Sequence, residues 1–280
     1  MFFYGFMQRA FQASFLISLI APVLGLFLIL RGQSLIADTL SHVSLAGVAI
    51  GLLAGVSPTW TTILVVIVAA LLLEYIGAIY KTYSEVSIAI LMTAGLSVAL
   101  VLMSFNESGT SVNIQQYLFG SIVTISAGQV QVLLGLTVVI LALYVFFKKP
   151  MYVLTFDEDT AFTAGLPVRL MTISFNILTG VAIAVMMPIV GALLVSSILV
   201  LPAAISMQLT KSFNGVISLG IVVAMIGMFS GLIGSYQLDT PPGATIALIF
   251  IFLFILVTLG KKIGKKLLYN QMNKKENDLI

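Results

Sequence analysis

The sequence contains no cysteine, a single histidine and few charged residues of either sign. Without cysteine, the chain can form neither a disulfide framework nor a thiolate metal site. With His42 as its only histidine, it cannot build the two-histidine H-E-x-x-H site of zinc proteases, and it contains no G-x-x-x-x-G-K-[ST] phosphate loop. These absences disfavour an enzyme and exclude ATP hydrolysis by the usual loop within this chain.

What the sequence has instead is a succession of long apolar runs. Of its 280 residues, 60% are hydrophobic and 8% are charged, a composition that soluble domains of this size do not have. Each run of about 20 residues can cross the roughly 30 Å of hydrocarbon in a bilayer, and such runs satisfy their backbone hydrogen bonds there as helices. We therefore predict an all-α polytopic membrane protein. The basic pI does not indicate a nucleic-acid partner, because six of the thirteen basic residues lie in the last twenty positions, where a positive tail is ordinary at a membrane edge.

Charged and Gly/Pro-rich breaks divide the apolar sequence into nine predicted transmembrane helices. We expect them near residues 11–30, 35–55, 60–80, 86–105, 130–147, 168–187, 190–209, 213–235 and 243–260. The segment 106–129 is too polar at its start to span, so we expect an external loop with a short re-entrant or interfacial helix around 117–125. The N-terminus lacks the basic start and cleavage site of a secretory signal, and the first run is therefore expected to be retained.

The distribution of Lys and Arg predicts the orientation, because cytoplasmic loops carry an excess of these residues. Nine spans with the N-terminus outside and the C-terminus inside place twelve of the thirteen basic residues in the cytoplasm and leave only Arg9 outside. We therefore expect one transmembrane domain over residues 1–262, interrupted by a cytoplasmic segment at 148–169, and a basic cytoplasmic tail at 263–280.

Asp38 and His42 are ionisable residues in a run that is otherwise apolar or small, DTLSH and its surroundings. Four residues apart, they project within about 40° of each other on a helix, whereas Ser44, Gly47 and Gly51 form a small-residue stripe suited to close packing on the far side. A carboxylate in a span costs roughly 2.5 to 3.5 kcal/mol on insertion scales, so it faces protein or a water-filled path. Asp38 could simply bond His42 or cap the helix.

The functional alternative for Asp38 and His42 is a metal contact, because carboxylate oxygen and imidazole nitrogen together suit Zn²⁺, Mn²⁺ or Fe²⁺. Two ligands are too few for a structural zinc site, which normally closes four. A transient site on a transport path must bind weakly enough to release the ion. Two copies of the chain would supply two carboxylates and two imidazoles, which makes a homodimer chemically attractive.

The cytoplasmic segment contains a second candidate, a short amphipathic helix. Its acidic start and helical spacing precede residues that stop a helix. The members of this candidate set are Asp157, Glu158, Asp159, Ala161, Gly165, Leu166 and Pro167. The helix is either a solvated connector between two spans or a docking element for a soluble partner.

Other polar or helix-bending residues have weaker interpretations. Glu74 is expected to pair with Lys81 or to reach the interface, and Asn176 and Gln208 are expected to form hydrogen bonds between helices. A possible gate or hinge is formed by Pro188, Gly191 and Pro202, although such residues are also ordinary in membrane helices.

Five motifs occur in order along nearly the whole chain. They are LRGQSLIADTLSHVSLAGVAIG at 30–51, IQQYLFGSI at 114–122, FDEDTAFTAGLP at 156–167, VGALLVSSILVLPAA at 190–204 and LDTPPGATIAL at 238–248. With these motifs the chain resembles the membrane permease subunits of the metal-ion ABC importers, a family that takes up zinc, manganese or iron. The plan is more distantly similar to that of the vitamin B12 and siderophore importers with one leading span removed.

This resemblance implies a homodimeric permease of the bacterial cell membrane with two cytosolic ATPase subunits and an extracellular metal-binding protein or lipoprotein. It implies that Asp38 and His42 contact the metal in the translocation path and that residues 157–167 form the coupling helix that docks on the ATPase. The metal is then a transported substrate and not a permanently bound cofactor.

The wording DTLSHVSLAG is closer to the zinc permeases, because the manganese permeases more often have a proline after the position of Leu45, where this chain has Ala46. A zinc importer is therefore expected. A manganese or iron importer permease is the alternative, and a stand-alone secondary metal transporter is a further one.

Overall fold

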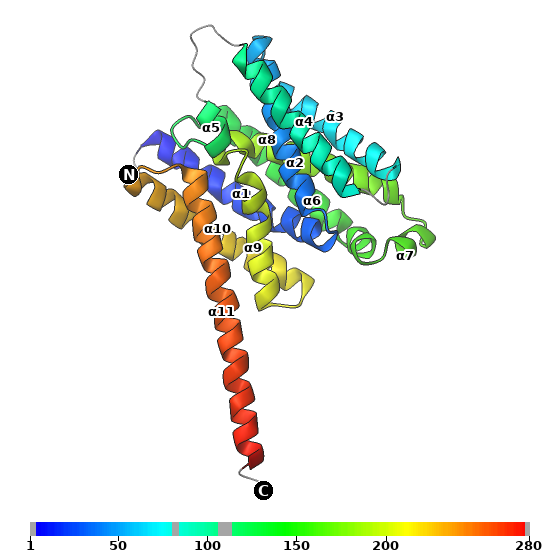
Figure 1. The fold of residues 1–280 in the computed structure, drawn as a ribbon, viewed down its shortest axis with the longest axis vertical. Helices are drawn as coiled ribbons and strands as arrows, with labels where there is room; N and C mark the ends of the chain where they lie inside the picture. The colour runs from blue at the N-terminus through cyan, green and yellow to red at the C-terminus, as the bar shows by residue number, and fades with distance from the viewer. Residues whose placement is uncertain (1–3, 80–83, 106–113, 278–280) are drawn as a thin grey trace.

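The computed structural model describes residues 4–79, 84–105 and 114–277, and every regular element in these ranges is a helix (Figure 1). The elements are α1 (Gly5–Leu30), α2 (Ser34–Leu53), α3 (Pro58–Ile79), α4 (Ser84–Ser104), α5 (Ile114–Phe119), α6 (Ala127–Phe156), α7 (Glu158–Thr163), α8 (Val168–Val190), α9 (Val195–Leu209), α10 (Phe213–Leu238) and α11 (Pro242–Asn277). The predicted all-α class is confirmed.

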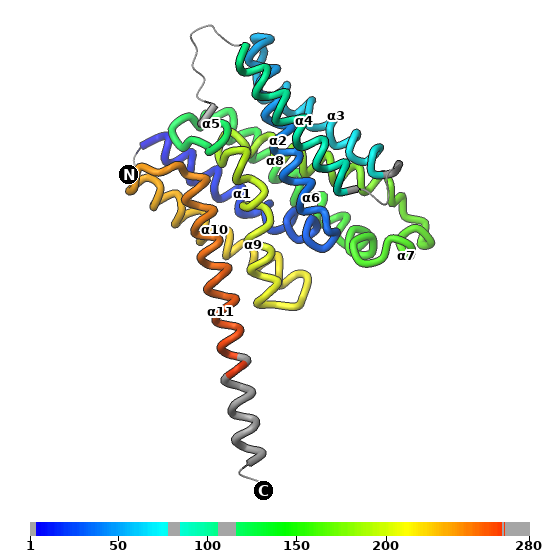
Figure 2. The backbone as a smooth tube through the Cα atoms, viewed as in Figure 1, coloured from blue at the N-terminus to red at the C-terminus, as the bar shows by residue number. Residues whose placement is uncertain are grey.

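Eight of the described helices, all except α5, α7 and α9, are long and apolar enough to cross a membrane. The seventh predicted span, 190–209, is instead the 15-residue helix α9, because the chain leaves the helical path between Gly191 and Leu194. At 1.5 Å per residue α9 is about 22 Å long, which is short for a complete crossing. Gly191 adopts a φ of 98°, which favours glycine, and this break separates α9 from α8 (Figure 2).

Two further boundaries differ from the predicted ones. Helix α6 does not end at residue 147 but continues through Lys148, Lys149 and Pro150 to Phe156, which makes it about 45 Å long. The short helix expected around 117–125 is α5, and it ends at Phe119 because Gly120 takes a φ of 78°. The part of the predicted external loop at 106–113 lies outside the described residues.

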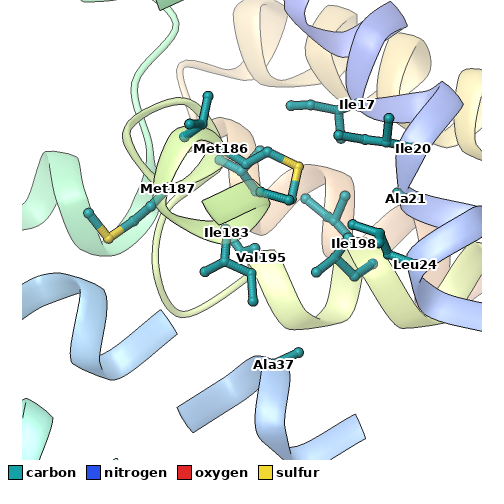
Figure 3. Close-up of a cluster of buried hydrophobic side chains, with 14 of the residues drawn as sticks. Ile17, Ile20, Ala21, Leu24, Ala37, Ile183, Met186, Met187, Val195 and Ile198 are labelled. Carbon is teal, nitrogen blue, oxygen red and sulfur yellow. The ribbon is translucent and has the colours of Figure 1, made fainter. Parts of the chain in front are cut away.

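Helices α1, α2, α8 and α9 build the centre of the molecule. Helix α2 packs against α3, α4, α8 and α9, and α1 packs against α6, α9 and α10. Figure 3 shows side chains of α1, α8 and α9 meeting in this core, among them Ile20, Ile183, Met186 and Ile198. Helices α1 and α2 are buried on most sides, so most positions on α2 contact other helices.

Helices α1 and α9 approach each other so closely that one position must be glycine. A Cβ added at Gly25 would overlap the backbone carbonyl of Leu199 and would lie 3.4 Å from Cβ of Ala203. A backbone carbonyl cannot rotate away as a side chain can, so the two helices would have to separate.

We expect Gly25→Ala to lower the stability of the folded protein by about 1 to 3 kcal/mol through overpacking. The measurement is the thermal unfolding midpoint of the detergent-solubilised protein. Gly135→Ala is the matched control, because a Cβ at this helical glycine of α6 meets nothing within 4 Å. Equal midpoints for the two variants would contradict the close α1–α9 packing.

Candidate functional site

Asp38 and His42 lie on one face of α2 and are both half-buried in a helix whose residues from Val43 to Ala49 are fully buried. Asp38 lies in the second turn of the helix, whose N-cap is Gln33, so the capping alternative is wrong. Among the described residues no hydrogen bond joins Asp38 to His42. The carboxylate and the imidazole can therefore each interact with other groups.

The partner of Asp38 is Ser196, whose hydroxyl donates a hydrogen bond of 3.2 Å to Oδ1 of Asp38. Ser196 is the second residue of α9, which begins immediately after the break that follows α8. The break therefore brings the N-terminus of α9, with its partial positive charge, next to the carboxylate of Asp38. Ser196 was not among the predicted site residues; the two adjacent serines that follow Gly191 are the sequence signal that could have indicated it.

His42 has a ring nitrogen that takes part in no hydrogen bond in the described structure. Its Nδ1 is buried and has no hydrogen-bond partner within the described ranges. A neutral imidazole nitrogen without a hydrogen bond can bind a metal ion. Asp38 and His42 thus supply one oxygen and one nitrogen from the same face of α2.

No cluster of three or more His, Cys, Asp or Glu side chains that could hold a metal occurs in the part of the chain that the structure describes. Asp38 and His42 are two potential ligands, fewer than the four of a closed structural zinc site. An ion held by so few groups is held weakly, as release along a path requires.

The opposite face of α2 packs as predicted. A Cβ at Gly47 would lie 2.5 Å from Cα of Thr62, and one at Gly51 would lie 2.9 Å from Cα of Pro58, both at the start of α3. The Ser44 hydroxyl lies 2.8 Å from Sδ of Met187 on α8. Because this stripe fixes α2 against α3 and α8, it also fixes the direction in which Asp38 and His42 face.

The predicted short helix of the 148–169 segment is confirmed as α7. Asp157 caps it, accepting a hydrogen bond of 3.0 Å from the backbone N–H of Thr160 and another from the Thr160 hydroxyl. These hydrogen bonds lower the pKa of Asp157, so the cap weakens only in acid, as the pH falls through that lowered value. At the other end Gly165 turns with a φ of 78°, and the N–H of Leu166 bonds back to the carbonyl of Ala161.

Helix α7 presents one buried and one exposed face. Ala161 is buried in a small core with Leu154 of α6 and Met171 of α8. Glu158, Asp159 and Phe162 are exposed, and Phe162 leaves 74% of its surface uncovered. An exposed aromatic side chain beside two carboxylates is suited to a protein partner.

Two of the three hinge candidates lie at the α8–α9 break. Pro188 is in the last turn of α8, Pro202 is inside α9, and Gly191 lies between the two helices. Hydrogen bonds of 2.8 Å and 3.2 Å join the backbone N–H groups of Ala192 and Leu193 to the carbonyls of Tyr117 and Leu118 in α5. The break that positions Ser196 is thus held in place by α5.

The remaining polar residues pair between helices, as expected for two of them. Nδ2 of Asn176 donates to Oε2 of Glu74 at 3.4 Å, and the Thr258 hydroxyl donates to Oε1 of Gln208 at 2.9 Å. The expected partner of Glu74, Lys81, lies outside the described residues. Nε of Arg9 donates to the carbonyl of Ile125 at 2.6 Å.

The fold is that of a multi-pass helical membrane protein, and its helix α2 carries a half-buried ionisable pair. Ionisable residues within membrane-spanning helices commonly mark transport paths. The chain belongs to the ABC 3 transport family, whose model matches residues 3–261. It is a multi-pass protein of the bacterial plasma membrane, and the predicted resemblance to metal-ion ABC importer permeases is confirmed.

Three relatives carry names from metal transport. The chain is 31% identical to a probable metal transport system membrane protein of Treponema pallidum, over 94% of this chain and 98% of that protein. It is 30% identical to the manganese transport system membrane protein MntC of Halalkalibacterium halodurans, with 90% and 86% covered, and 27% identical to the high-affinity zinc uptake system membrane protein ZnuB of Haemophilus influenzae, with 88% and 94% covered.

Among solved structures, the chain is similar to one in the PsaBC complex of Streptococcus pneumoniae bound to a Fab. The TM-score is 0.82, the sequence identity is 27%, and 91% of each chain is covered. The overall arrangement of the helices is therefore shared with a solved structure over nearly the whole chain.

Proposed function

We propose that this chain is the permease subunit of an ATP-driven importer of a divalent transition-metal ion, and that Asp38 and His42 contact the ion on its path. The observation that carries the proposal is the pair itself: an oriented carboxylate and an imidazole with an unpartnered nitrogen, on a buried helix of an ABC 3 family member. The ion is the cargo, and no permanently bound metal is part of the proposal.

A homodimer would complete the site. One chain offers one carboxylate and one imidazole, and a second copy related by a twofold axis would double both. Four ligands of these types suit zinc, manganese or iron. A path along such an axis would let the ion bind between the two copies of α2.

The other partners follow from family membership and from α7. The chain has no nucleotide-binding loop, so ATP would be hydrolysed by a separate cytosolic subunit that docks on α7. An extracellular metal-binding protein would deliver the ion at the opposite end. Two observations support a cytosolic α7 and an extracellular α5. Arg31 and Arg169, two basic residues expected in the cytoplasm, line the same cleft as Glu158 of α7, whereas Arg9, the basic residue expected outside, is bonded to Ile125 near α5.

The proposed mechanism is alternating access. ATP-driven movement of α7 would be transmitted to the spans, and the α8–α9 break with Pro188, Gly191 and Pro202 would act as the gate. Because Ser196 starts α9 and holds Asp38, movement at the break would directly change the surroundings of the carboxylate.

Zinc is the metal that we propose first, on the wording of the DTLSH motif and the similarity to a zinc uptake protein. Manganese is the second candidate. It is favoured by the oxygen donors near the site, the Asp38 carboxylate and the Ser196 hydroxyl, and by the slightly higher identity to a manganese transport protein.

The test is competition for uptake in cells that lack the gene and carry it on a plasmid. We expect excess unlabelled Zn²⁺ to suppress labelled zinc uptake at lower concentrations than Mn²⁺ or Fe²⁺ do. If labelled manganese is taken up and Zn²⁺ competes no better than Fe²⁺, the assignment to zinc is wrong. If none of the three metals is taken up, the assignment to a metal importer is wrong as well.

A further inference from the structure

A cleft of about 1000 Å³ lies between the α1–α2 turn, α3, α4, α7 and α8. It is on the other side of α2 from the proposed metal site, because Ile36 lines it and residue 36 lies about 200° around the helix from Asp38. Four charged side chains line the cleft: Arg31, Glu74, Glu158 and Arg169. Because this cleft lies between α7 and the proposed metal-binding helix α2, side chains in the cleft can connect these two helices.

Arg31, at the C-terminal end of α1, is held against α8 in this cleft. Its Nη2 donates a hydrogen bond of 2.8 Å to Oγ1 of Thr172, and its guanidinium lies 5.8 Å from the ring centroid of Phe175. Burial lowers the pKa of Arg31, while the carboxylates of Glu158 and Glu74 act in the opposite direction, so both are within electrostatic reach. Its Nη1 is nevertheless buried without a hydrogen-bond partner in the described structure.

The backbone of Arg31 leads directly into the metal-binding helix. Gly32 turns with a φ of 65°, and the N–H of Gln33 bonds back to the carbonyl of Leu28 at 2.8 Å, which makes the turn tight. Helix α2 starts at Ser34, one turn before Asp38. A displacement of Arg31 is therefore transmitted to Asp38 through a short and rigid segment.

Helix α8 holds the other side of the cleft. Thr172 and Asn176 are one helical turn apart, and they bind Arg31 and Glu74 respectively. Asn176 is 2% exposed, and its Oδ1 has no partner among the described residues. Glu74 already accepts from Asn176, whereas no hydrogen bond of Glu158 occurs in the described ranges, so Glu158 is the carboxylate that is free to move.

We propose that Arg31 is a positioning residue that couples α7 to α2: when α7 shifts, the Glu158 carboxylate binds the unpartnered Nη1 of Arg31, and this contact moves the α1–α2 turn and Asp38 with it. This inference rests on the proposed function of α7 as the ATPase docking helix. A charged donor that is buried without a partner is unfavourable, so a carboxylate brought within reach is bound.

The experiment uses the complex of the permease with its ATPase subunit in liposomes, supplied with the binding protein and zinc, and measures metal imported per ATP hydrolysed. We expect Arg31→Gln to lower this ratio by about tenfold, a typical size for coupling between two sites, while ATPase co-purification and basal hydrolysis stay unchanged. Glu158→Gln is expected to lower the ratio as well, and the double variant is expected to be no worse than either single one.

Further variants separate coupling from folding. Arg31→Lys keeps the charge and should retain part of the ratio, and the exchange Arg31→Glu with Glu158→Arg should restore part of what each change removes. Glu85→Gln, at an exposed carboxylate in the first turn of α4, is the control and should leave the ratio unchanged.

A wild-type ratio of metal imported to ATP hydrolysed in Arg31→Gln would overturn the inference. A double variant whose loss equals the product of the two single losses would also overturn it, because the two residues would then act independently. If the wild-type chain itself binds no ATPase subunit, the proposed function fails, which is a different result.

Discussion

Asp38→Asn is expected to abolish metal uptake and to leave the amount of protein in the membrane unchanged. The amide keeps the size of the carboxylate and can still accept the hydrogen bond from Ser196, so folding should be preserved. What is lost is the negative charge that holds a divalent cation beside the imidazole. The measurement is uptake of labelled metal into cells, normalised to the permease in the membrane fraction.

Three other substitutions help to interpret this result. Asp239→Asn is the matched control, because Asp239 is exposed and has a φ of 51°, a conformation that asparagine tolerates. Ser196→Ala removes only the group that orients Asp38, and losses of about 10- to 100-fold are typical when such a supporting partner is removed. His42→Gln should resemble Asp38→Asn. Normal uptake in either ligand variant would contradict the ligand assignment.

Phe162→Glu is expected to detach the permease from its ATPase subunit and thereby to stop uptake. Phe162 is 74% exposed on α7, and an exposed aromatic side chain is the type that anchors protein interfaces. Losing such an anchor costs about 2 kcal/mol or more, which is roughly a 30-fold loss of affinity. The measurement is the amount of ATPase subunit that co-purifies with the permease.

Phe105→Ala is the control for Phe162, because Phe105 is 69% exposed beyond the end of α4, far from α7 in the sequence. Phe162→Ala should give a smaller loss than Phe162→Glu, since it removes the aromatic ring without adding a charge. Full recovery of the ATPase subunit with Phe162→Glu would show that α7 is a connector and not a docking helix.

Most of the fold could be predicted from the sequence, because long apolar runs and the breaks between them are local properties. The exceptions are positions where tertiary contacts override the local pattern. Helix α6 passes through Lys148 and Lys149, which mark a membrane edge by composition but do not disfavour a helix. A break between α8 and α9 was expected near Pro188 and Gly191, but the backbone hydrogen bonds from Ala192 and Leu193 that tie it to α5 are not indicated by any local pattern.

The candidate site was predictable only in part. Asp38 and His42 stood out because ionisable residues are rare in this chain and costly in a membrane. Ser196 could not be assigned to Asp38, because the two are 158 residues apart and meet only through the break. Arg31 was counted only as an orientation signal; its contact with Thr172, 141 residues away, depends on how α8 packs against the α1–α2 turn.

The most direct test of the central claim is metal accumulation in liposomes that contain the purified permease with its ATPase subunit. With the binding protein outside and ATP supplied at the ATPase, we predict that zinc accumulates against its gradient. Replacing ATP by an analogue that cannot be hydrolysed, or Asp38 by Asn, should stop the accumulation. Zinc accumulation that continues without ATP hydrolysis and follows an imposed ion gradient would contradict the account, because it would identify a secondary transporter.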